Sequence, residues 1–173
     1  MKRITIGGKE YTFKFSVRAS LYNECTEAIL DGYAMSGRMS ASAEENDAEA
    51  MYKEIISTMA NIPKKATTLF YAGLLEYHGA KGDGSVKSFN DAVDLITDYL
   101  EENTDDEGKC NKSFSDVLNE MMEIMYDDNF FALIGLDKIT SRQTEDQTED
   151  QTEDKPKRQR RKKSEVGEST STN

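Results

Sequence analysis

The sequence predicts a mainly α-helical fold: a compact domain of about five helices with an N-terminal β-hairpin, followed by a disordered charged tail. Apolar residues recur at three- and four-residue spacing over most of the chain up to Leu136. The first residues alternate in polarity on either side of Gly7-Gly8. Apolar residues become rare after Leu136. We therefore expect a folded body at residues 1–136 and a tail at residues 137–173.

The N-terminal segment KRITIGGKEYTFKF predicts a hairpin with Gly7-Gly8 at the two turn positions. This register pairs Ile6 with Lys9, Ile4 with Tyr11 and Lys2 with Phe13. It places four apolar side chains on one face: Ile4, Ile6, Tyr11 and Phe13. A two-stranded hairpin is marginal alone. It must therefore lie on helices or on another chain's sheet. The unpaired outer edges of the hairpin are a candidate oligomerisation surface, and simple docking on its own body is the alternative.

The segment from Pro63 to Gly79, PKKATTLFYAGLLEYHG, is apolar around most of its circumference and predicts a central helix. Pro63 suits the first helical turn, where its missing N–H costs nothing, and Gly79 suits a left-handed C-cap. We expect Gly73 to allow a neighbouring helix to approach closely, because it has no side chain.

Two helices are predicted before the central one. Ser16 is a candidate N-cap for a helix from Val17 to about Leu30, in which Cys25 is a small core residue and Asp31-Gly32 is the stop. Residues 34–40 are predicted as a loop, and a second helix is expected from Ser42 to about Asn61. Its inward apolar stripe would consist of Ala48, Met51, Tyr52, Ile55, Ile56 and Met59.

Two more helices and a short apolar segment are predicted after it. Ser88 and Asp91 form a variant capping box for a helix that ends near Asn103, with Val93 and neighbouring apolar residues inward. Ser113 or Ser115 caps the last long helix, which has a broad apolar face. The segment Phe130 to Leu136 is expected to fold back onto the body.

Methionine is concentrated in the last long helix, and two phenylalanines follow it. The residues are Met121, Met122, Met125, Phe130 and Phe131. Methionine fills irregular gaps in cores, and core filling is one interpretation. Flexible methionines also form adaptable grooves for partner helices. We treat these five residues as the candidate partner-binding surface, with core filling as the alternative.

Charge and cysteine content restrict the function. Residues up to Leu136 include 24 acidic and 13 basic residues and carry the whole net charge of −11, which argues against nonspecific nucleic-acid binding by the body. Cys25 and Cys110 form no CxxC pair and no disulfide framework. Without a signal peptide or an apolar run near 18 residues, we expect a reducing cytoplasm and no membrane partner.

Motifs for catalysis, cofactors or metals are not found in the sequence. His78 is the only histidine and has no recognisable nucleophile partner, so we expect it to contact the terminal carbonyls of its helix. Asp91, Asp94 and Asp98 share a helix face but lack histidine or cysteine partners and indicate a solvated face. The loop around Asp105 lacks the spacing of a calcium loop. We expect no catalytic residues, no cofactor and no metal, and therefore no enzyme.

The tail combines three successive QTED repeats, from Gln143 to Asp154, with a basic cluster. Such a composition offers too few apolar side chains to offset the entropy of folding and predicts disorder. The cluster is a candidate anion-binding segment, and a solvated linker is the alternative. Its basic residues are Lys155, Lys157, Arg158, Arg160, Arg161, Lys162 and Lys163.

Three segments together resemble a known family. They are the initial ITIGGKEYTFKF, the segment LFYAGLLEYHG, and the pattern F-x-x-A-x-x-L-I from Phe89 to Ile96. In this layout, with a polar tail after the body, the chain resembles the tail assembly chaperones of long-tailed (siphovirus-type) phages that infect Gram-positive bacteria. The resemblance covers Met1 to about Leu136.

The resemblance implies a non-enzymatic function. Such chaperones bind the tape measure protein, keep it soluble, and help recruit tail tube subunits during tail morphogenesis. The expected location is the cytoplasm of the infected bacterial host, with absence from the mature virion. The family often makes a longer form by ribosomal frameshifting, for which the codons of Lys162-Lys163 are a candidate site. A homo-oligomer is a further expectation.

Two other functions stay open at this point. A nucleic-acid-associated adaptor would act through the basic cluster, and its binding would fall steeply with salt. A structural head–tail joining protein would be found in purified particles.

Overall fold

The computed structural model describes residues 1–44, 47–105 and 107–138, and these residues are mainly helical with an N-terminal hairpin, as predicted. The predicted disordered tail, with its QTED repeats and basic cluster, lies outside them. None of the described helices is long and apolar enough to cross a membrane. The elements in chain order are β1 (Lys2–Ile6), β2 (Lys9–Phe13), α1 (Val17–Ser20), α2 (Asn23–Glu44), α3 (Ala48–Leu74), α4 (Phe89–Glu101), α5 (Phe114–Asp127) and α6 (Phe130–Leu133).

The hairpin has the predicted register. Ile6 pairs with Lys9, Ile4 with Tyr11 and Lys2 with Phe13, and both turn glycines have positive φ. Ile4, Ile6 and Phe13 are buried and Tyr11 is partly buried, all against the helices of the same chain. The apolar face of the hairpin therefore docks on its own body, so these four side chains are not available to a second copy. Oligomerisation through the outer edges of the hairpin stays a prediction.

Several polar contacts hold the hairpin in place. The backbone N–H of Lys14 donates to the carbonyl of Gly73 at 2.8 Å. The N–H of Gly7 donates to Glu102, and the ammonium of Lys2 lies 2.7 Å from Glu120 on α5. Burial of Glu120 opposes its ionisation, but hydrogen bonds, first from Lys112 and then from Lys2, outweigh it and lower its pKa.

Gly73 allows close packing, but against the hairpin and not against a helix. A Cβ at Gly73 would lie 3.0 Å from Cδ1 of Phe13 and 3.4 Å from Cζ of Phe15. Phe13 also packs edge-on against Phe70 of α3, with ring centroids 4.8 Å apart. Phe13 and Phe15 therefore occupy the space that any larger residue at position 73 would need.

The first two predicted helices are wrong in their boundaries. Ser16 caps α1 as expected, but α1 ends at Ser20, and Val17 and Leu21 are exposed. A new helix, α2, begins at Asn23 and continues through Gly32 and the segment predicted as a loop. Helical glycine costs only about 1 kcal/mol, and packing of α2 against α3 offsets it. The glycines therefore do not end the helix.

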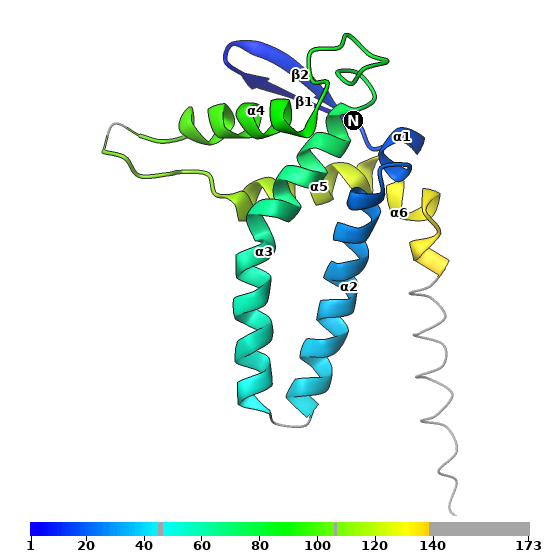
Figure 1. Cartoon of the computed structure of the whole chain (residues 1–173), viewed down its shortest axis with the longest axis vertical. Helices are drawn as coiled ribbons and strands as arrows, with labels where there is room; N and C mark the ends of the chain where they lie inside the picture. Colours follow the sequence, from blue (N-terminus) through cyan, green and yellow to red (C-terminus); the bar gives the residue numbers. More distant parts are fainter. Residues whose placement is uncertain (45–46, 106, 139–173) are drawn as a thin grey trace, which may run out of the picture. The chain divides into compact units, whose positions relative to one another are not determined.

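The predicted boundary at Pro63 is also wrong. α3 runs from Ala48 through Pro63 to Leu74, and turns, not helix, lead on to Gly79. Figure 1 shows α3 changing direction part-way along its length. Proline removes one helical hydrogen bond and its ring crowds the preceding turn, so the helix bends there. The helix continues past the proline when tertiary contacts stabilise the segment that follows it. Here the buried segment from Ala66 to Leu74 provides those contacts.

The C-terminal elements agree with prediction. Ser88–Asp91 and Ser113–Asp116 form capping boxes at the starts of α4 and α5. Cys25 and Phe130 are buried, and α6 folds back onto the body. Val93 is exposed, contrary to expectation. Asp91 caps α4, and Asp94 and Asp98 on the same helix are exposed, as expected of a solvated face.

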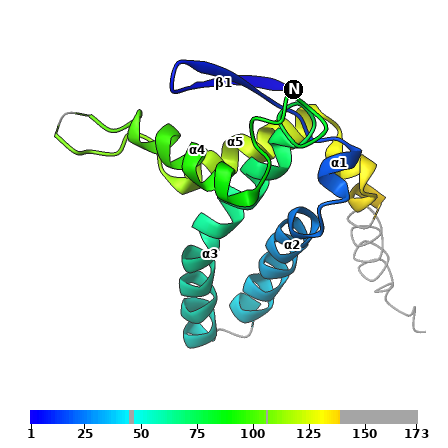
Figure 2. The same ribbon diagram turned by 45° about the horizontal axis from the view of Figure 1, so that its top comes forward.

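α2 and the outer part of α3 form an antiparallel pair that extends away from α4, α5 and the hairpin (Figures 1 and 2). No side chain of α3 from Ala48 to Lys65 is buried. We call α2 together with α3 residues 48–65 the arm. The arm brings its base next to α5, and the candidate site lies there.

Candidate functional site

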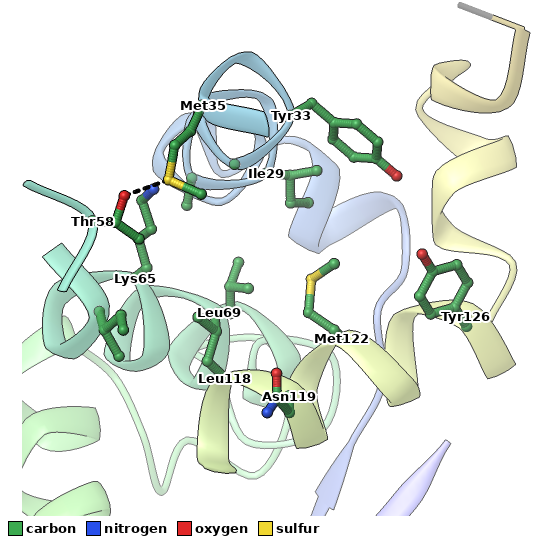
Figure 3. Close-up of a pocket in the computed structure, with 13 residues that line it drawn as sticks. Ile29, Tyr33, Met35, Thr58, Lys65, Leu69, Leu118, Asn119, Met122 and Tyr126 are labelled. Atoms are coloured by element: carbon green, nitrogen blue, oxygen red, sulfur yellow. Dashed lines mark hydrogen bonds between the residues drawn. The ribbon is translucent and has the colours of Figure 1, made fainter. Parts of the chain in front are cut away.

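An apolar groove lies where α2, α3 and α5 meet, and its cavity volume is about 370 Å³. α2 contributes Ile29, Tyr33 and Met35 to its lining. Ile62 and Leu69 come from α3, and Leu118, Met122 and Tyr126 come from α5. Figure 3 shows these elements surrounding an open space, with Met122 and Leu69 pointing into it and Tyr33 and Tyr126 at one side. Leu69 and Ile29 are buried, and the others are partly or largely exposed.

The groove is lined by residues from three helices because α2 and α3 keep one helix face toward each other. Ile62 and Leu69 are seven residues apart on α3, and Ile29 and Tyr33 are four apart on α2, so each pair shares a face. The bend of α3 separates the arm from the part of the helix that α5 covers. The groove therefore has a firm base and an open mouth.

Charged groups at the groove are paired with one another. The ammonium of Lys65 lies 2.5 Å from Oδ2 of Asp31, and Arg38 contacts both Asp31 and Glu54. The hydrogen bond from Lys65 lowers the pKa of Asp31. These pairs connect α2 to α3 along one side of the arm. The positive charge of Lys65 is thus balanced by Asp31, and Lys65 does not make the groove an anion site.

Tyr33, at the mouth of the groove, is neutral at physiological pH. Burial, and then the neighbouring Tyr126 hydroxyl, raise the pKa of Tyr33 above its usual value of 10.0. Its hydroxyl can therefore donate or accept a hydrogen bond at the mouth without bringing charge into it. An apolar base with a few uncharged polar groups at the edge suits an amphipathic partner.

The structure places the five predicted partner-binding residues in two different environments. Met121, Met125 and Phe130 are fully buried, and Phe131 is nearly so. The core-filling alternative therefore fits these four, and their assignment to an exposed surface is corrected. Met122 alone of the five lines the groove. Consecutive residues on a helix point about 100° apart, which explains why Met121 and Met122 differ.

A second apolar feature was predicted as core and is exposed. Tyr52 is 65% exposed, Ile55 39%, Ile56 50% and Met59 63%. These four residues, which we call the arm stripe, have the spacing i, i+3, i+4, i+7 of one helix face. The periodicity identified the face correctly, but the described residues provide no element that covers it. The sequence pattern does not show whether another element covers an apolar helix face.

His78 has a structural role different from the predicted one. Its Nε2 accepts the backbone N–H of Thr12, and its Nδ1 faces Asp83 and Ser85 at 2.9 and 3.2 Å. Both ring nitrogens are thus engaged in joining the hairpin to the loop after α3.

Burial raises the pKa of the Cys25 thiol to about 12, so this thiol stays protonated. Among the described residues, no group of three or more metal-ligating side chains is found.

The basic cluster proposed for anion binding lies outside the described residues, so its structure does not bear on the site. Comparisons with protein-family models, with curated proteins and with solved structures found no match. The groove and the arm stripe are therefore interpreted from their own chemistry.

Proposed function

We propose that this protein is a phage tail assembly chaperone that binds the tape measure protein, keeps it soluble and helps recruit tail tube subunits. In this proposal the groove holds the apolar face of a client helix. The observation that carries it is an open apolar groove of about 370 Å³ formed by three helices, with Met122 in its lining. Flexible methionines and a concave apolar surface are the features with which proteins bind amphipathic helices.

The charge distribution supports the same proposal. The body has a net charge of −11 up to Leu136, which keeps a complex with an apolar client soluble and repels nucleic acid. The charged side chains nearest the groove are already paired with each other. A client bound there would therefore not bury an unpaired charge. Weak contacts repeated along a long helical client would add up to avidity.

The experiment is co-expression of the full chain with the long helical protein encoded next to it, followed by co-purification at moderate salt. We expect a soluble complex with a client that is insoluble alone. Met122→Asp and Ile62→Asp place a charge in the groove and should each abolish recovery of the client. Val93→Asp is the matched control, because Val93 is a partly exposed apolar residue on α4, outside the groove lining. Equal recovery with all three variants would refute the groove as the client site.

A nucleic-acid-associated adaptor is the second candidate, favoured by the seven basic residues among the nine from Lys155 to Lys163. It predicts nucleic-acid binding that weakens steeply with salt and disappears on truncation after Asp154. The chaperone proposal predicts that the same truncation leaves client recovery intact. The two functions are therefore separated by one truncated chain tested in both assays.

A further inference from the structure

The arm stripe continues a helix face that is buried elsewhere in the same helix. Tyr52, Ile55 and Ile56 each lie eighteen residues before Phe70, Gly73 and Leu74, which is five helical turns. Phe70, Gly73 and Leu74 are buried under the hairpin and the neighbouring helices. Past the bend at Pro63, the described residues leave the corresponding face uncovered.

Charge limits what can cover the stripe. The α3 segment from Ala48 to Lys64 contains two acidic and two basic residues, so it is neutral, whereas the body has a net charge of −11. Glu49 and Lys53 pair with each other at 2.7 Å on the side of the helix next to the stripe. Two copies of such an acidic body repel each other over most of their surface. The neutral outer part of α3 is where two copies can meet at the lowest electrostatic cost.

We propose that the arm stripe binds the arm stripe of a second copy, with the two α3 helices antiparallel about a twofold axis. The stripe is symmetric about the point between Ile55 and Ile56, so it complements itself in this arrangement. Tyr52 then lies level with Met59 of the second copy, and Ile55 and Ile56 surround the axis.

The area is enough for a reversible dimer. Four large side chains, each between 39% and 65% exposed, offer on the order of 400 Å² of apolar surface per copy. Two copies together reach about 800 Å² from the stripe alone, which is below the roughly 1,200–2,000 Å² of stable interfaces and fits a weak dimer that dissociates on dilution. Ile62 of the groove lies seven residues after Ile55, so the groove adjoins one edge of the stripe, while Tyr52, Ile56 and Met59 lie farther around the helix.

The first test is sedimentation equilibrium of the full chain without any client. We expect a concentration-dependent dimer for the wild type and a monomer for Ile56→Asp, because a charge would be buried at the axis. Ser57→Asp is the matched control, since Ser57 is exposed on the same helix but points away from the stripe, and it should stay dimeric. A wild-type monomer at all concentrations overturns the proposal. If client recovery also falls for Ile56→Asp in that case, the stripe belongs to the client.

The second test fixes the geometry with single cysteines in a Cys110→Ser background, where the remaining Cys25 is buried. Ile55→Cys and Ile56→Cys should each form a disulfide with themselves across the axis. Tyr52→Cys should not, because its two copies would be about 10 Å apart along the helices, but it should cross-link to Met59→Cys on mixing. Self-cross-linking at all four positions would indicate parallel helices and overturn the antiparallel arrangement. Because no client is present, either result is independent of the function proposed above.

Discussion

The backbone N–H of Thr12 donates a hydrogen bond of 2.9 Å to Nε2 of His78, and this bond attaches the edge of the hairpin to the loop that follows α3. Nε2 must be unprotonated to accept, so the ring proton lies on Nδ1, which faces Oδ2 of Asp83. The ring of His78 also packs edge-on against Tyr11, with centroids 5.1 Å apart. One histidine thus fixes a strand, a loop and their relative orientation.

Replacing His78 by alanine should destabilise the fold. The N–H of Thr12 would lose its partner in a partly buried position, which costs about 1–3 kcal/mol. Urea unfolding followed by far-UV circular dichroism measures the change. Ser85→Ala is the control, because it removes a contact of Nδ1 but leaves the bond to Thr12. Equal midpoints for wild type and His78→Ala would contradict the role given to this bond.

Asp83 should make stability depend on pH in the acid range. Hydrogen bonds from the Ser85 hydroxyl and backbone, and then from His78, lower the pKa of Asp83 from 3.8 to about 2. The carboxylate is therefore more acidic in the folded chain, and its stabilisation is present above about pH 4 and lost as the pH falls through about 2. Asp83→Asn should be less stable than wild type at neutral pH, and the difference should vanish on acidification.

Unfolding midpoints measured from pH 7 to pH 2 test this prediction. Asp94→Asn on the exposed side of α4 controls for the loss of one negative charge from an acidic body. A difference between Asp83→Asn and wild type that stays constant over the whole range would contradict it.

Two glycines in helices should respond in opposite directions to alanine. At Gly73 the new methyl group would lie 3.0 Å from Phe13, and the strain should cost about 1–3 kcal/mol. At Gly37 in α2 no atom lies within 4 Å, and the gain in helix propensity should stabilise by about 0.5–1 kcal/mol. Thermal unfolding of both variants measures the signs. A stabilised Gly73→Ala would mean that the hairpin does not pack as described.

Two adjacent methionines form a matched pair. Met121→Ala should destabilise by about 2–4 kcal/mol, because Met121 is fully buried and the substitution leaves a cavity. Met122→Ala should change stability by less than about 1 kcal/mol, because its side chain already borders the open groove. Chemical unfolding separates them, and similar large losses at both positions would place Met122 in the core.

Sequence patterns predicted the elements whose signals are local. Gly7-Gly8 fixed the register of the hairpin, and Ser88 and Ser113 marked the starts of α4 and α5, because turn glycines and capping side chains act within a few residues. The same local reasoning failed for Pro63 and for the loop expected after Gly32. There, packing between α2 and α3 decides the outcome, and a short sequence window does not contain it.

The candidate site was predicted less well for a related reason. Periodicity shows that Met121 and Ile55 each lie on an apolar face, but only the arrangement of other elements decides which face is covered. Met121 is covered by the body, while Ile55 lies on an arm that nothing in the described residues covers on that side. Of the five residues that the sequence assigned to a partner surface, only Met122 lines the groove.

The bend in α3 divides one continuous helix into two parts with different local stability. From Ala66 to Leu74 nearly every side chain is buried, whereas from Ala48 to Lys65 none is. Backbone amides of the inner part exchange with solvent only through large-scale unfolding, while those of the outer part exchange through openings that cost little. A ligand on the arm would therefore slow deuterium uptake before Pro63 and leave the amides after Ala66 unchanged.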